Sequence, residues 1–124
     1  MGVRFLKVAA VYFVFGVLLG LTMGITQNFS FTSVHAHLNL LGWVSMALFG
    51  VIYLLFPVAG ESKLATVHFW LHNLGLPLMQ GTLFIMLLTS SHTIVGLTIV
   101  GSIMVVVGAV LFMVNVFQNV NLNK

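Results

Sequence analysis

Four long apolar stretches, separated by short polar segments, make up most of the chain. A membrane-spanning helix needs roughly 20 predominantly apolar residues, and every stretch is long enough. The stretches cover residues 5–25, 33–56, 64–88 and 92–117. Because the connections are too short to hold a soluble domain, consecutive helices must be antiparallel neighbours. The pattern predicts an all-α membrane protein, a four-transmembrane-helix bundle forming one domain over residues 1–124.

Helix-breaking and capping residues occur where this pattern places the ends of the helices. Pro57 and Gly60 open the middle loop, and we expect Ser90 and Ser91 to cap the last helix. Pro77 lies inside the third stretch, where we expect it to kink the helix. Neighbouring helices can satisfy the backbone groups that such a kink frees.

The composition agrees with a chain that dissolves in lipid. Of 124 residues, 60% are hydrophobic and 4% are charged, whereas charged residues make up about a quarter of a soluble domain. The net charge of +3 arises from very few groups and forms no basic patch, so we expect no nucleic-acid partner. The absence of cysteine excludes disulfides, thiolate catalysis, iron–sulfur ligation and covalent c-type haem attachment, which leaves histidine as the main candidate for metal chemistry.

The positive charges indicate an orientation in the membrane. Arg4 and Lys7 precede the first span, Lys63 lies in the middle loop and Lys124 ends the chain, so all four fall on one side. The loops on the other side carry no charge. Because cytoplasmic loops are enriched in Lys and Arg, we expect both termini in the cytoplasm.

Three glycines in the first span recur at every fourth position: Gly16, Gly20 and Gly24. They line one face of a helix with exposed backbone, which allows another helix to approach closely. Packing within the bundle and self-association of the chain are both compatible with this face.

His35 and His37 lie near the outer end of the second span. Residues two apart on a helix differ by about 200° in direction, so the two rings point to nearly opposite sides and must serve different neighbours. Each ring can present a nitrogen to a haem lying along the helix. Alternatively, they form hydrogen bonds across helices or reach the outer interface.

Three more histidines could bind a metal ion or have a structural role. His68 and His72 share a helix face, a spacing that can hold one metal ion. Because Trp70 lies between them near the cytoplasmic side, we favour a role as polar anchors of the helix end. His92, beside Ser and Thr residues at the start of the last span, is more typical of a cap or an interface residue than of a ligand.

Two motifs in residues 34–84 share their order and spacing with a known family. The first motif comprises His35, His37, Leu41-Gly42-Trp43, Gly50, Tyr53 and Pro57. The second comprises Ser62, Leu64-Ala65, His68-Phe69-Trp70 and Gly75. This segment resembles helices ten and eleven of catalytic subunit I of the haem–copper oxidases, and the cbb-type oxidases look most similar.

The resemblance implies haem b as the cofactor and axial ligands to its iron. It assigns His35 to the high-spin, oxygen-reducing haem and His37 to the low-spin, electron-transferring haem, with Gly42 beside the cofactor. His92 is the third candidate for a metal ligand. His68 matches a family position that is not a ligand.

The chain also departs from the family. It lacks the three further histidines that bind the family's copper, the second histidine of the low-spin haem and the outer-side arginine pair that holds the haem propionates. A copper site is therefore possible but not supported. Because the family's twelve helices form three arcs of four, the resemblance implies a homotrimer, with haem between protomers.

These observations predict a membrane-embedded b-type haem protein that resembles a minimal haem–copper oxidase core. It would serve in electron transfer or in binding O2 or NO, as a multi-pass protein of a bacterial cytoplasmic membrane in contact with lipid. Two alternatives stay open. One is a haem-free scaffold or assembly subunit of a respiratory complex, and the other is a trimeric enzyme similar to an oxidase or a nitric-oxide reductase.

Overall fold

The computed structural model describes residues 1–122, which form helices and turns and no strand. Four helical segments in this range are long and apolar enough to cross a membrane. The prediction of an all-α chain with four helices able to span a membrane is therefore confirmed over the described residues. The elements in chain order are α1 (Gly2–Thr26), α2 (Thr32–His37), the π-helix η1 (Leu38–Val44), α3 (Ser45–Leu55), α4 (Pro57–Gly60), α5 (Lys63–Thr89) and α6 (Val95–Asn119).

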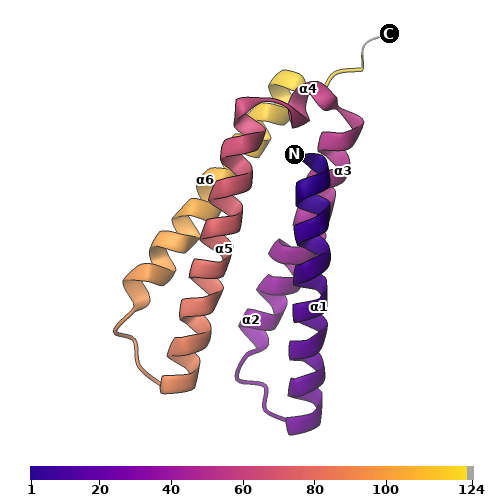
Figure 1. The fold of residues 1–124 in the computed structure, drawn as a ribbon. Helices are drawn as coiled ribbons and strands as arrows, with labels where there is room; N and C mark the ends of the chain where they lie inside the picture. Colours follow the sequence, from indigo (N-terminus) through magenta and orange to yellow (C-terminus); the bar gives the residue numbers. More distant parts are fainter. Residues whose placement is uncertain (123–124) are drawn as a thin grey trace.

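The helices form two antiparallel hairpins (Figure 1). One hairpin pairs α1 with the second span, which is made of α2, η1 and α3. The other pairs α5 with α6. Helix α4 connects the hairpins at the end of the molecule where α1 begins, and the Met1 ammonium donates a hydrogen bond to the Gly60 carbonyl there at 3.3 Å. The opposite end carries the loops that close the two hairpins.

Local sequence explains how the chain turns at this end. Phe56 adopts an extended conformation (φ −123°, ψ 81°), as a residue before proline prefers, and Pro57 begins α4. The Ser62 side chain accepts a hydrogen bond from the backbone N–H of Ala65 at 3.2 Å and so caps α5. Helix α5 continues through Pro77.

The prediction that Ser90 and Ser91 cap the last helix is wrong. Helix α6 begins at Val95 behind Ile94, which forms no side-chain cap hydrogen bond. Ser90 instead ends α5 in the left-handed conformation, with φ 52°. Ser91 bonds to Thr93 within the loop. The Ser91 hydroxyl therefore forms hydrogen bonds within the loop and does not cap α6.

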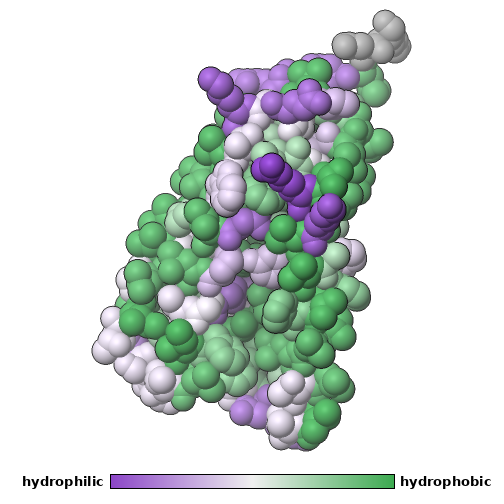
Figure 2. Space-filling model, in the orientation of Figure 1, coloured by the Kyte–Doolittle hydropathy of each residue, from purple (hydrophilic) through white to green (hydrophobic). Residues whose placement is uncertain are grey.

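Apolar side chains cover most of the face that Figure 2 shows. On this face the most hydrophilic side chains are concentrated towards the end formed by α4 and the start of α1, and smaller hydrophilic areas lie in the middle and at the opposite end. Arg4, Lys7, Glu61 and Lys63 are all exposed at or near this end. Such a surface suits hydrocarbon around the spans and water or headgroups at the charged end.

Two glycines of α1 serve packing inside the bundle. A Cβ at Gly16 would lie 2.7 Å from the Asn39 side chain, and one at Gly20 would lie 2.9 Å from the His35 ring. A Cβ at Gly24 would meet nothing within 4 Å. The glycine face therefore brings α1 close to the second span at Gly16 and Gly20, and leaves its last position open.

The second span changes helical register in its middle. Leu38–Val44 is a π-helix, and the N–H of Ser45 bonds to the Leu40 carbonyl five residues back. From α5, His72 donates its Nε2 proton to the Leu41 carbonyl at 2.8 Å. The wider turn lies between α2, which carries His35 and His37, and α3, whose Met46 and Tyr53 belong to the hydrophobic core.

Candidate functional site

His37 ends α2, and its hydrogen bonding leaves one ring nitrogen available. Its Nδ1 lies 2.7 Å from the Ser33 carbonyl oxygen one turn earlier in the same helix. Because a carbonyl only accepts, Nδ1 carries the proton, and in the neutral ring Nε2 holds the free lone pair. The ring is partly exposed. His37 thus presents an unprotonated nitrogen at the surface of the bundle.

His35 is held differently, two residues earlier. Asn39 Nδ2 lies 3.1 Å from its Nδ1 and also donates to the His35 carbonyl at 2.8 Å. Because an amide NH2 group only donates, Nδ1 of His35 is the acceptor and Nε2 carries the proton. The ring also packs against α1 at Gly20. Its ring is therefore engaged inside the hairpin.

These two arrangements test the fit of the pair to a haem. An axial ligand needs an imidazole nitrogen with a free lone pair, and ligating histidines commonly donate their other N–H to a backbone carbonyl. His37 meets both conditions. His35 meets neither in this state, since ligation through Nε2 would require its proton to move and the contact with Asn39 to change.

Gly42 and His92 lie apart from this arrangement. Gly42 is buried, and a Cβ there would come within 2.7 Å of the Tyr12 ring. The space beside Gly42 is thus filled by α1, so its contact is with a helix of the same chain. His92 is exposed in the loop before α6, where its carbonyl accepts from the Val95 N–H.

His68 and His72 lie inside the bundle, so the prediction that they anchor the helix end at the membrane interface is wrong. Their exposed fractions are 0% and 1%, whereas Trp70 between them is 51% exposed. The reason is that their shared helix face points to the other helices and Trp70 faces outward. Aromatic rings surround the pair, with ring centroids 4.5–5.9 Å from that of His68: Phe5, Phe49, Tyr53 and Phe112.

The buried pair belongs to a polar cluster that includes residues outside the sequence prediction. The Tyr53 hydroxyl lies 2.9 Å from Nδ1 of His68. Asn115 of α6 donates to the Ala59 carbonyl at 3.0 Å and accepts from Asn119 at 2.7 Å. Asn115 inside an apolar span is the signal that could have identified this cluster, because polar side chains in hydrocarbon form hydrogen bonds with partners.

The cluster has no opening for a planar cofactor. His68 Nε2 and His72 Nδ1 find no hydrogen-bond partner within residues 1–122, yet both rings are enclosed by close-packed side chains. Across the same residues, no group of three or more His, Cys, Asp or Glu side chains could hold a metal ion. A copper site therefore has no ligand set in the described part of one chain, and among the candidate histidines the hydrogen bonding of His37 fits the requirements of a metal ligand best.

No family model, curated protein or solved structure matches the chain.

Proposed function

We propose that the chain is a membrane-embedded b-type haem protein, and that His37 supplies an axial ligand to the iron through Nε2. The observation that carries this proposal is the 2.7 Å hydrogen bond from His37 Nδ1 to the Ser33 carbonyl, which leaves Nε2 unprotonated on a partly exposed ring. Once bound, haem supplies one-electron redox chemistry or a site for a diatomic gas. Electron transfer or O2 or NO binding follows, according to whether the sixth position is filled.

A second copy of the chain completes the site in this proposal. His37 lies on the surface of the bundle, so a haem bound there needs cover from another molecule. Only 17–39% of the residues in the most apolar stretch of each span are buried within one chain. A homotrimer of twelve helices, with haem between protomers and both termini in the cytoplasm, is the assembly that we propose. Its setting is a bacterial cytoplasmic membrane.

His35 keeps its proposed role as ligand of a second haem, subject to a change of protonation. Iron at Nε2 requires the His35 proton on Nδ1, where the Asn39 amide now donates. We therefore expect His35 to bind haem less readily than His37. For the alternative of a trimeric oxidase-like enzyme, the described residues of a single chain offer no copper ligand set, so the ligands would have to come from more than one protomer.

An optical spectrum of the purified protein tests the proposal. The protein is expressed with ample haem, purified in mild detergent and scanned in oxidised and reduced forms. We expect a Soret band and b-type visible bands in the wild type and in His92→Ala, which removes the exposed histidine of the other loop. We expect their loss in His37→Ala, with recovery when free imidazole is added.

Two results would contradict the proposal. A colourless, iron-free wild type would exclude haem binding and favour the haem-free scaffold. A His37→Ala variant with an unchanged spectrum would show that another residue binds the iron. A haem-to-protein ratio and the mass of the complex, measured on the same sample, test the trimer separately.

A further inference from the structure

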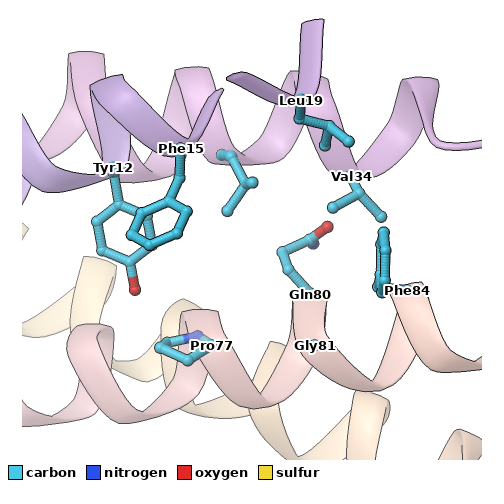
Figure 3. Close-up of a pocket in the computed structure, with 9 residues that line it drawn as sticks. Tyr12, Phe15, Leu19, Val34, Pro77, Gln80, Gly81 and Phe84 are labelled. Atoms are coloured by element: carbon cyan, nitrogen blue, oxygen red, sulfur yellow. The ribbon is translucent and has the colours of Figure 1, made fainter. Parts of the chain in front are cut away.

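Helix α1 packs on the rest of the bundle along one side. Its buried residues share that side: Gly2, Phe5, Ala9, Gly16 and Met23. Beside it, an apolar cleft of about 480 Å³ separates the two hairpins, and Figure 3 shows Tyr12 and Phe15 directed from α1 towards Pro77 of α5. Gln80, which is 3% exposed, also lines this cleft. The side of α1 opposite its buried residues faces outward.

The outward side of α1 carries a stripe of residues that are alternately three and four positions apart. Two cations begin the stripe, Arg4 and Lys7, and both are exposed. Five apolar residues continue it, each 52–74% exposed: Val11, Val14, Leu18, Leu21 and Ile25. Residues at this spacing lie on one side of a helix. We call these seven residues the α1 stripe.

The two cations lie on the membrane side of α4. A Cβ at Gly2 would come within 2.7 Å of the Leu54 side chain, so α1 begins beside the last turn of α3, and α4 lies beyond it (Figure 1). Arg4 and Lys7 are three positions apart, which separates them by about 4.5 Å along the helix axis on adjoining turns. Long cationic side chains at such a depth extend towards the lipid headgroups.

The side chains of the protein supply little negative charge for these cations. Glu61 is the only Asp or Glu, against four Lys and Arg residues. Arg4 and Lys7 also repel each other, because like charges one helical turn apart are unfavourable. The pair therefore suits an anion from outside the chain, and at the depth of the headgroups the available anion is a lipid phosphate.

A second copy of the chain is the other candidate to cover the α1 stripe, since a spacing of three and four is also typical of paired helices. Copies in one membrane share an orientation, so the stripes of two neighbours would run parallel. Arg4 and Lys7 of one copy would then face the same two residues of the other, and their charges would repel. Charge therefore favours a lipid over a second copy.

We propose that the α1 stripe binds an anionic glycerophospholipid. Arg4 and Lys7 donate hydrogen bonds to its phosphate, and an acyl chain lies along the apolar part of the stripe. The lengths agree, because α1 rises about 15 Å from Val11 to Leu21, and one leaflet contributes about half of a hydrocarbon core of roughly 30 Å. In a zwitterionic lipid the headgroup ammonium competes for the phosphate, so the stripe prefers a lipid with net negative charge.

This inference does not depend on haem, so it is tested on the haem-free protein in lipid nanodiscs, where both leaflets have the same composition. The chain contains no cysteine, so Val11→Cys provides a single attachment point for a fluorophore. The probe is phosphatidylglycerol with a nitroxide on its acyl chain, which quenches a fluorophore that it contacts. Phosphatidylcholine with the same labelled chain is the matched lipid. Val110→Cys, at a 48% exposed position, is the matched site, because α6 carries no charged residue.

We expect phosphatidylglycerol to quench the Val11→Cys label at a lower mole fraction than phosphatidylcholine does, and both lipids to quench the Val110→Cys label equally. Each cation contributes about fivefold to the preference. Arg4→Gln and Lys7→Gln should each lower the preference by that factor. Lys63→Gln, which removes the same charge from the start of α5, should leave it unchanged. All three cationic side chains are exposed, so these variants are expected to fold.

Three outcomes overturn the proposal. Equal quenching of the Val11→Cys label by the two lipids would show that the stripe has no preference for negative charge. An effect of Lys63→Gln as large as that of Arg4→Gln would show that the general charge of this end attracts the lipid, without a site on α1. A Val11→Cys label that neither lipid quenches, beside a quenched Val110→Cys label, would show that a second copy covers the stripe.

Discussion

Two pairs of histidines occupy opposite halves of the same bundle and differ in what surrounds them. In the half near α4, His68 and His72 are 0% and 1% exposed among aromatic rings. In the other half, His35 and His37 are partly exposed near the start of the second span. The comparison shows that residue type alone does not define a ligand. A ring closed in by its neighbours stabilises the fold, and a ring with a free, accessible nitrogen can bind iron.

The two halves also differ in how tightly the hairpins meet. Near α4, a cluster built around Phe5, Met46 and Tyr53 fills the space between them. Towards the other end lies the cleft, with the unpaired acceptor of Gln80. We infer that the half near α4, called the inner half below, carries most of the folding stability. The half near the loops that close the hairpins, called the outer half, is free to bind ligands. Substitutions matched between the halves can break this comparison.

The largest expected effect is the loss of an aromatic ring from the inner half. Phe5 is 0% exposed and packs on His68, Tyr53, Phe49 and Phe69. Phe5→Ala should lower the free energy of unfolding by about 3–5 kcal/mol. Phe117→Ala is the control, because Phe117 is 81% exposed at the end of α6. SDS titration of the protein in mild detergent measures the free energy of unfolding of both variants. An equal loss in Phe5→Ala and Phe117→Ala would contradict the assignment of Phe5 to the core.

Removal of one hydroxyl tests the polar part of the inner cluster. Tyr53→Phe takes the partner from His68 Nδ1 and should lower the free energy of unfolding by about 1–3 kcal/mol. Tyr12→Phe is the control, since Tyr12 is also a partly buried tyrosine of the bundle but its hydroxyl is not a partner of His68. The same SDS titration compares them. A Tyr53→Phe variant as stable as Tyr12→Phe would mean that the hydroxyl does not support the histidine.

A smaller effect is expected where α1 meets the second span. Gly20→Ala places a Cβ 2.9 Å from the His35 ring, so the ring must shift at a cost of about 1 kcal/mol. Gly24→Ala meets nothing within 4 Å and should leave the stability unchanged or slightly raised. If both variants lose stability equally, the glycine face packs against something other than the second span, such as a second copy.

The smallest effect on stability is expected at the proposed ligand. The His37 ring bonds only locally, to Ser33 of its own helix, and is partly exposed. His37→Ala should change the free energy of unfolding of the haem-free protein by no more than about 0.5 kcal/mol. A large loss in the SDS titration would make His37 a structural residue like His68.

Hydropathy predicted the four spans because length and apolar content alone decide which segments dissolve in lipid. The predicted ends lie within three residues of the observed helices. The start of α6 at Val95 rather than at 92 was missed, since the hydroxyls near Ser91 bond within the loop. The π-helix at Leu38–Val44 was also missed, because packing against α1 and α5 sets the register and no local sequence signal marks it.

The site was predictable only in part. The 100° step per helical residue predicted different surroundings for His35 and His37, and they do have different neighbours. The same rule placed His68 and His72 on one face but could not tell whether that face points outward, because apolar residues occur on all sides of α5. The cleft at Gln80 depends on the gap between hairpins, which a sequence pattern does not encode.

The protonation of His37 in the haem-free protein is the most direct test of the central claim. Nitrogen NMR of 15N-histidine protein, with His37→Ala used to assign the signal, reports which ring nitrogen carries the proton. We predict a protonated Nδ1 and a bare Nε2 for His37, and a shift of that Nε2 signal when haem is added. A proton on Nε2, or a His37 signal that haem leaves unchanged, would contradict the account.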